Sequence, residues 1–106
     1  MTKSLIQQSK ECIVCRTTLD LDRHHIFQGR NRKKSDQFGC TCWLCKRHHT
    51  TTSEGVHFNI ELDSELKDYC QRIFELEYSQ IEFMYHFGKN YKQSKYDKGG
   101  YKWINK

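Results

Sequence analysis

The sequence predicts a small α+β protein of one domain, in which two short strands are held by a metal site and are followed by helices. The chain has 106 residues, the usual size of one domain with a modest core. In its first half, cysteines and histidines are spaced as metal ligands are. In its second half, apolar residues recur at helical spacing over an acidic stretch, residues 61–87.

Composition narrows the class of protein. The chain is 36% hydrophobic and 29% charged, with a mean hydropathy of −0.92, and no apolar run is long enough to cross a membrane. The N-terminus lacks the apolar stretch of a secretory signal, so we expect a cytoplasmic protein without a membrane partner. In that reducing compartment, paired cysteines are more often metal ligands than disulfides.

Charge is distributed unevenly along the chain. The net charge is +5, yet residues 61–87 hold seven acidic and two basic side chains. The positive charge is therefore concentrated in GRNRKK (29–34) and in the tail after Gly88. This asymmetry indicates a polyanionic partner for the basic segments.

Along the first half, the predicted elements follow one another closely. Residues 1–11 are expected to be a polar, weakly ordered lead-in, and the segment 12–27 a tight turn followed by a strand. GRNRKKSDQFG (29–39) has a glycine at each end and is predicted to be a loop. CTCWLC (40–45) is predicted to be a second strand with its apolar face formed by Cys40, Cys42 and Leu44. KRHHTTTSEG (46–55) is predicted to be a helical turn or loop that ends at Gly55.

Two helices are predicted in the second half. Asp63 is a candidate N-cap of the first, whose buried face would hold Leu66, Tyr69, Cys70 and Ile73. Ser79 to Glu82 has the form of a capping box, which opens a second helix that ends at Gly88. The face of this second helix would hold Phe83, Met84 and Phe87. We therefore place one domain over residues 12–88 and expect residues 89–106 to be a flexible basic and aromatic tail.

Two pairs of residues have the spacing of a tetrahedral zinc site. They are Cys12-x-x-Cys15 and Cys45-x-x-His48, and they predict a structural zinc with three cysteine ligands and one histidine ligand. Cys42-x-x-Cys45 offers an alternative second pair that would release His48. Cys40 and Cys70 are expected to be small buried apolar residues.

Four histidines remain in the same region: His24, His25, His49 and His57. A structural zinc is closed once it has four ligands, so the surplus imidazoles indicate a second, open site. In a strand, His24 and His25 point to opposite faces and would have different tasks. One could bind a divalent cation while the other accepts a proton from water, as phosphodiester hydrolysis requires.

The order CIVC, RHHI, WLCKRHH resembles an HNH nuclease of the ββα-metal (His-Me finger) class with an embedded zinc. The continuation GVHFNIELD, with HFGKNY after the helices, is similar to small phage-encoded HNH proteins of the recombination-enhancement, RecA-dependent nuclease family. The resemblance covers roughly residues 12–91. It implies a ββα-metal core, a metal-dependent DNA endonuclease, and a recombinase filament as a possible partner in phage DNA processing.

Residue by residue, the resemblance makes His24 a ligand of the catalytic metal, His25 the general base and His49 the second metal ligand. The metal would be Mg²⁺ or Mn²⁺, and an imidazole-rich site could also hold nickel or zinc. The asparagine of the family motif is missing, because Cys40 stands about where it is expected. Asn59 could take over its supporting role, and His57 could replace or join His49. His86 is expected to be structural or exposed.

Arg30, Arg32, Lys33 and Lys34 would contact DNA phosphates beside this site, with little sequence specificity. Lysines alternate with aromatic residues in the tail, a pattern that suits stacking on unpaired bases. Two other functions stay open. One is a non-catalytic, zinc-stabilised DNA-binding or adaptor module, and the other is a redox or zinc sensor that uses Cys40-Thr-Cys42.

Overall fold

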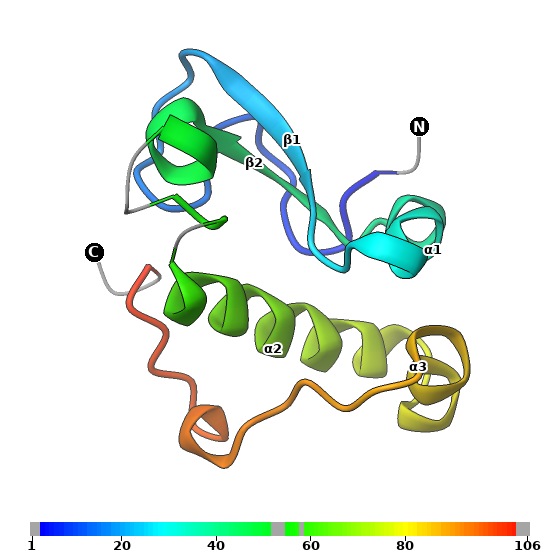
Figure 1. Cartoon of the computed structure of the whole chain (residues 1–106). Helices are drawn as coiled ribbons and strands as arrows, with labels where there is room; N and C mark the ends of the chain where they lie inside the picture. Colours follow the sequence, from blue (N-terminus) through cyan, green and yellow to red (C-terminus); the bar gives the residue numbers. More distant parts are fainter. Residues whose placement is uncertain (1–2, 52–54, 58, 104–106) are drawn as a thin grey trace.

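A two-stranded sheet and one long helix form the frame of the protein, which we describe from a computed structural model covering residues 3–51, 55–57 and 59–103 (Figure 1). The strands are β1 (Leu21–His25) and β2 (Thr41–Cys45), and helix α1 (Arg32–Phe38) lies between them in the chain. After β2 come a short π-helical turn η2 (Arg47–Thr51), helix α2 (Ile60–Glu77) and helix α3 (Gln80–Phe87). The prediction of a small α+β protein is confirmed.

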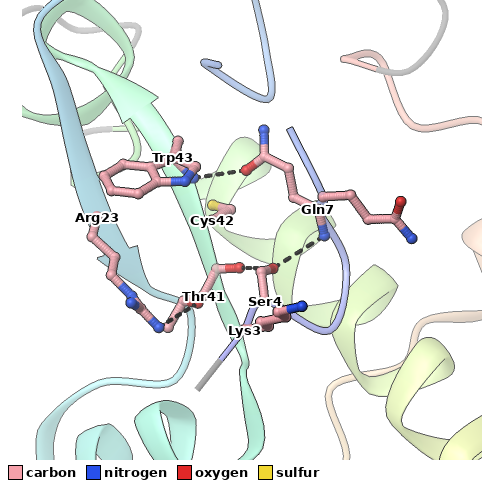
Figure 2. A pocket seen from close by; sticks show the side chains of 8 residues that line it. Lys3, Ser4, Gln7, Arg23, Thr41, Cys42 and Trp43 are labelled. Carbon is pink, nitrogen blue, oxygen red and sulfur yellow. Dashed lines mark hydrogen bonds between the residues drawn. The ribbon is translucent and has the colours of Figure 1, made fainter. Parts of the chain in front are cut away.

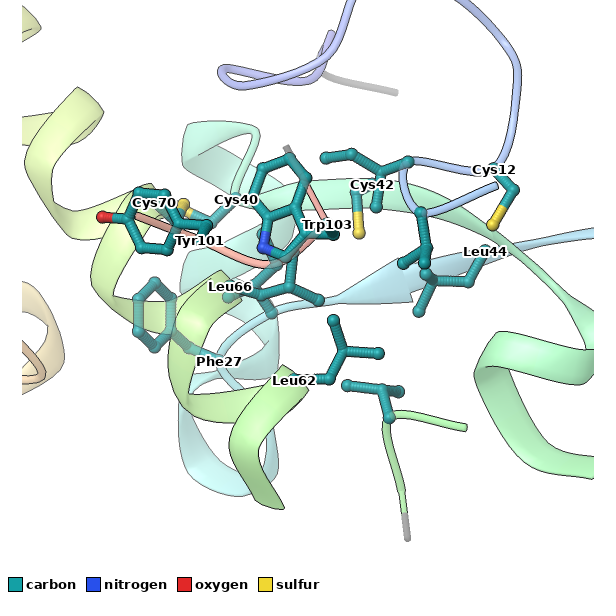
Figure 3. Close-up of a cluster of buried hydrophobic side chains, with 14 of the residues drawn as sticks. Cys12, Phe27, Cys40, Cys42, Leu44, Leu62, Leu66, Cys70, Tyr101 and Trp103 are labelled. Carbon is teal, nitrogen blue, oxygen red and sulfur yellow. The ribbon is translucent and has the colours of Figure 1, made fainter. Parts of the chain in front are cut away.

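The pairing of the strands decides which side chains face the helix. β1 and β2 are antiparallel, with Arg23 opposite Trp43 and His24 opposite Cys42. Cys42 and Leu44 are buried, as the alternation of side chains predicts, and Cys40 just before the strand is buried too. Figure 3 shows these residues facing Leu62 and Leu66 of α2 across the core. Arg23 and Trp43 therefore lie on the opposite, outer face of the sheet.

The basic segment predicted to be a loop is helical, so that prediction was wrong. A single 3₁₀ turn, η1 (Gly29–Asn31), leads into α1. Ser35 on the inner side of α1 is buried, and its hydroxyl both accepts from the Phe27 backbone N–H (3.0 Å) and donates to the Phe27 carbonyl (2.6 Å). Because this helix is only seven residues long and its one fully buried side chain is a serine, it has no apolar periodicity in its sequence.

Helix α1 ends at a glycine for two reasons. Gly39 has a left-handed backbone conformation with φ of 75°, which closes the helix. A Cβ atom at this position would also lie 2.2 Å from the carbonyl oxygen of Lys3. The N-terminal segment can therefore pass directly over the end of α1.

Helix α2 begins four residues earlier than expected. Asn59, and not Asp63, is the N-cap, because its side-chain oxygen accepts a hydrogen bond from the Leu62 N–H at 3.1 Å. Asp63 lies in the first turn and pairs with Lys67 at 2.9 Å. Leu66 and Cys70 are buried as predicted, whereas Tyr69 and Ile73 are only half-buried.

Helix α3 has the predicted bounds. The Ser79 hydroxyl accepts from the Glu82 N–H at 3.1 Å, and Gly88 ends the helix in the left-handed conformation. Phe83 and Phe87 are buried, whereas Met84 is exposed and does not belong to the buried face.

The tail was expected to be flexible, and this prediction was wrong. The segment after α3 returns along α2 (Figure 1), and its aromatic side chains Tyr96, Tyr101 and Trp103 are buried. The fully buried Asp68 on α2 accepts hydrogen bonds from Arg72 Nε (2.7 Å), the Gln93 N–H (2.7 Å) and the Tyr101 hydroxyl. The tail thus satisfies a buried carboxylate of the acidic helix, which residue spacing alone does not reveal.

The N-terminal lead-in is also part of the fold, contrary to its predicted weak order. The Leu5 N–H donates to the Gly39 carbonyl at 2.7 Å, and the Trp43 N–H donates to Gln7 Oε1 at 2.8 Å. The segment therefore covers part of the edge and outer face of β2.

None of the helices in the described ranges combines the length and the hydropathy that spanning a membrane requires.

Candidate metal centres

The first candidate centre brings together the four residues of the preferred zinc set. Their donor atoms all lie within 4.8 Å of one another, and the residues are Cys12, Cys15, Cys45 and His48. Cys12 and Cys15 lie in a tight turn closed by the Arg16 N–H, which donates to the Cys12 carbonyl at 2.8 Å. Cys45 ends β2, and His48 lies on η2. Segments about 30 residues apart in the chain therefore meet at one point.

The distances in this centre fit a tetrahedral ion. An ion about 2.3 Å from each sulfur would separate two sulfur ligands by roughly 3.8 Å. The Cys15 and Cys45 sulfurs are 3.7 Å apart, and His48 Nδ1 lies 3.3 Å from the Cys45 sulfur and 3.7 Å from the Cys12 sulfur. The donor set and its spacing therefore suit Zn²⁺.

The alternative ligand set is not brought together in the described part of the chain, because Cys42 does not belong to this group of donor atoms. Its side chain lies in the core (Figure 3), and burial raises the pKa of its thiol. At Cys12 burial acts in the same direction, but backbone hydrogen bonds outweigh it and the pKa of the thiol is lowered. Since the thiolate is the metal-binding form, the raised pKa of its thiol makes Cys42 a poor candidate to take the place of His48 beside Cys12, Cys15 and Cys45.

The second candidate centre consists of His24, His49 and His57, whose donor atoms also lie within 4.8 Å of one another. His24 points inward from β1, and His49 lies on η2. His57 is held beside them because its N–H donates to the His49 carbonyl at 3.4 Å. The ring centres of His24 lie 5.4 Å from His49 and 5.6 Å from His57, with 4.7 Å between His49 and His57.

Two nitrogen atoms of this centre are placed as metal ligands would be. His49 Nδ1 lies 3.0 Å from an oxygen of Asp22, an arrangement that directs the Nε2 lone pair away from the carboxylate. That Nε2 lies 3.1 Å from His57 Nε2. Two imidazole nitrogens bound about 2.1 Å from one ion would be roughly 3.0 to 3.4 Å apart.

His24 supplies the third nitrogen. Its Nε2 is buried and has no hydrogen-bond partner among the described residues. Burial, followed by the neighbouring imidazoles of His49 and His57, lowers the pKa of His24 to about 3, so the ring is neutral. A buried, neutral imidazole nitrogen without a partner is unfavourable unless a ligand such as a metal ion occupies the site.

His25 lines the same cleft as His24, His49 and His57. This cleft, of about 300 Å³, is lined by Arg23, His24, His25, Gln28, Gly29, Arg32, His49 and His57. His25 Nε2 lies 3.5 Å from Asp36 Oδ1 on α1. The end of β1 thus brings both members of the histidine doublet to one cleft, although they leave the strand on opposite faces.

Only some of the basic residues predicted to contact DNA lie at this cleft. Arg32 lines the cleft, and Arg30 and Lys33 are exposed nearby on η1 and α1. Lys34 turns toward α3, where its Nζ lies 3.3 Å from His86 Nδ1. His86 was expected to be structural or exposed; its half-buried ring packs against Phe38 with 4.5 Å between ring centres.

Asn59 does not line this cleft. It caps α2 and borders a different hollow, together with His48 and Glu65.

The burial of Tyr96, Tyr101 and Trp103 removes most of the tail aromatics from any contact with DNA bases. Cys40 and Cys70 are buried as predicted.

Two carboxylates beside the histidines were missed at the sequence level. Asp22 lies two residues before His24 on the same strand face, and this alternation could have indicated it. Asp36 lies in the segment taken for a loop, so its approach to His25 had no signal in the sequence.

No family model matches the chain, and no curated protein or solved structure matches it either.

Proposed function

We propose that this protein is a metal-dependent endonuclease of the HNH type, which hydrolyses phosphodiester bonds in DNA with low sequence specificity. The main support is the buried, unpartnered His24 Nε2 within a histidine cluster that shares one cleft with His25 and Arg32. We place its work in phage or prophage DNA processing in the reducing cytoplasm, where thiols stay free to bind zinc and a recombinase filament is a candidate partner.

The two centres have different tasks in this proposal. Zn²⁺ at Cys12, Cys15, Cys45 and His48 would hold the turn, the sheet and η2 together. A divalent cation at His24, His49 and His57 would stabilise the charge that develops on the phosphate oxygens. Imidazole donors favour transition metals over Mg²⁺, so we expect Mn²⁺ or Ni²⁺ to act at lower concentrations than Mg²⁺.

His25 is the proposed general base. Its side chain is 18% exposed, so water can reach it at the cleft while the Asp36 carboxylate 3.5 Å away orients the ring. Asp36 would thereby replace the missing asparagine as the group that positions the base. Arg32, which also lines the cleft, would hold the phosphate backbone.

A nicking assay on supercoiled plasmid tests the proposal. In the presence of Mn²⁺ or Mg²⁺, His25→Ala should nick about 10²- to 10⁴-fold more slowly than the parent, with unchanged zinc content and circular dichroism. His86→Ala is the matched control, because His86 lies outside the cleft, against Phe38. Parental nicking by His25→Ala would contradict the mechanism.

A non-catalytic, zinc-stabilised DNA-binding or adaptor module is the second candidate function. Its support is that three imidazole donors within 4.8 Å also suit a permanently bound zinc ion. Two zinc ions per chain that resist chelation, together with DNA binding and no nicking with any divalent cation, would favour this candidate.

A further inference from the structure

A second hollow lies on the outer face of the sheet, between the N-terminal segment and β2 (Figure 2). Its volume is about 700 Å³. We call it the Trp43 groove, and it is lined by Lys3, Ser4, Gln7, Gln8, Arg23, Thr41, Cys42 and Trp43. Nothing in the proposed reaction uses this groove, although its volume is in the usual range of ligand sites.

The groove combines cations with one aromatic ring. In the described part of the chain, its lining contains Lys3 and Arg23 and no carboxylate. Trp43 is half-buried, and Lys10 Nζ lies 4.7 Å from the centre of its ring. A basic hollow with an accessible indole favours a ligand that carries both negative charge and a flat aromatic group.

Trp43 is held in place before any ligand arrives. Its backbone N–H donates to Gln7 Oε1 at 2.8 Å, and Arg23 lies opposite it on β1. The Ser4 hydroxyl accepts from the Gln7 N–H at 3.0 Å and donates to the Thr41 carbonyl. These contacts tie the N-terminal wall of the groove to the sheet (Figure 2), so little ordering would accompany binding.

The groove and the histidine cleft share one lining residue. Arg23 lines both hollows and directly precedes His24 and His25 in β1. Its guanidinium donates to Thr41 Oγ1 at 3.3 Å and lies 3.8 Å from the Asp36 carboxylate that faces His25. A chain of nucleotides with one phosphate at His25 would therefore bring a neighbouring nucleotide to the groove.

We propose that the Trp43 groove binds an unpaired nucleotide next to the scissile phosphate, with its base against the Trp43 ring and its phosphate at Arg23 and Lys3. This inference rests on the proposed function, because it names the form of the substrate: DNA that is single-stranded at this position. A paired base is covered by its neighbours and offers no free face to an indole, whereas an unpaired base does.

Tryptophan fluorescence tests the groove without any cleavage. The zinc-loaded His25→Ala protein, with no other divalent cation added, is titrated with an eight-nucleotide oligothymidine and with a closed hairpin whose stem is long enough to stay fully paired. Trp103 is only 5% exposed, so quenching would report on Trp43. We expect the single strand to quench strongly and to bind more tightly than the hairpin.

Substitutions then identify the base contact. The Trp43 variants lack the Trp43 signal, so binding is measured by fluorescence anisotropy of a dye-labelled oligothymidine. Trp43→Ala should weaken binding of the oligonucleotide by about fivefold to a hundredfold, the effect of losing one stacked base. Trp43→Phe keeps an aromatic ring and should retain most of the affinity. Tyr85→Ala removes a highly exposed aromatic side chain on α3, far along the chain from the groove, and should change nothing.

The outcomes separate the groove from the catalytic proposal. If Trp43→Ala binds the single strand as tightly as the parent, or if the hairpin binds equally well, the groove proposal is overturned whether or not the protein nicks plasmid. If Trp43-dependent binding of the single strand is found but no divalent cation supports nicking, the groove stands and the nuclease mechanism falls. Circular dichroism of each variant shows that the sheet is intact.

Discussion

The two candidate metal centres use neighbouring residues of the same turn, yet they are built differently. His48 completes a group of four donors, whereas His49 belongs to a group of three. Around the first group the surrounding contacts are mainly backbone hydrogen bonds and the apolar core. Around the second group lie the carboxylate of Asp22 and a cleft with basic residues at its edge. A filled ligand set stabilises a fold, and an incomplete one with a carboxylate behind it leaves positions for water and substrate.

The largest expected effect comes from removing a ligand of the four-donor centre, which is the closed one. Cys12→Ser should lose the structural zinc and with it cooperative folding, since zinc binding in small domains contributes about 10 kcal/mol or more to the folded state. Metal analysis and thermal unfolding followed by circular dichroism measure this loss. Cys42→Ala removes an equally buried thiol and should keep the zinc, at a cost of about 1 kcal/mol. Loss of zinc in Cys42→Ala, with retention in His48→Ala, would show that the alternative set of Cys12, Cys15, Cys42 and Cys45 binds the ion.

Removing a ligand from the open centre should leave the fold intact. His49→Ala is expected to abolish the binding of Mn²⁺ at the cleft and to slow plasmid nicking by at least about 10²-fold, because a ligand of the catalytic cation is lost. Calorimetric titration with Mn²⁺ measures the binding, and the thermal midpoint should shift by only a few degrees. A variant that unfolds like Cys12→Ser would mean that both centres are structural.

Substitutions of Asp22 and Asp36 should have smaller effects, and these should differ from each other. The Lys46 ammonium and His49 hold the pKa of Asp22 below its usual range, so Asp22 is ionised when it faces His49 Nδ1. Asp22→Asn should weaken Mn²⁺ binding by about 10- to 100-fold, the usual cost of losing a partner behind a metal-bound histidine. Asp36→Asn should leave Mn²⁺ affinity unchanged and lower kcat alone, because Asp36 faces the base. If the two variants behave alike, the assigned roles are wrong.

The sequence predicted the residues that are brought together more reliably than the contacts around them. The zinc set follows from ligand spacing, since two tight turns with a strand pair between them can meet in few ways. The N-cap of α2 was misplaced because Asn59 and Asp63 both suit that position, and the choice between them depends on where the preceding segment lies. The tail was misjudged because the burial of Tyr101 and Trp103 depends on α2 and leaves no periodic pattern.

The geometry of the histidine cleft was the least predictable part. The resemblance made His24 a metal ligand and His25 a general base, but strand alternation separates their side chains, and the course of the chain after β1 decides whether they reach the same space. η1 and α1, which follow β1 in the chain, set that course. Neither has an apolar repeat in its sequence, so the approach of Asp36 to His25 required the structure.

The smallest expected effect comes from replacing an exposed lysine near the histidine cleft. Lys33 is exposed beside the cleft, and Lys33→Gln should lower DNA affinity only a few-fold while reducing the dependence of log affinity on log salt by about one unit. Fluorescence anisotropy at several salt concentrations measures this slope. Lys98→Gln, an exposed substitution in the tail, is the control and should leave the slope unchanged.

The number and lability of the bound metal ions test the central difference between the centres most directly. After treatment of the purified protein with a mild chelator, metal analysis should find one zinc ion per chain, and titration with Mn²⁺ should find one further, exchangeable site that disappears in His49→Ala. Two zinc ions that both resist the chelator, or the absence of any second site for a divalent cation, would contradict the assignment of a closed structural centre beside an open catalytic one.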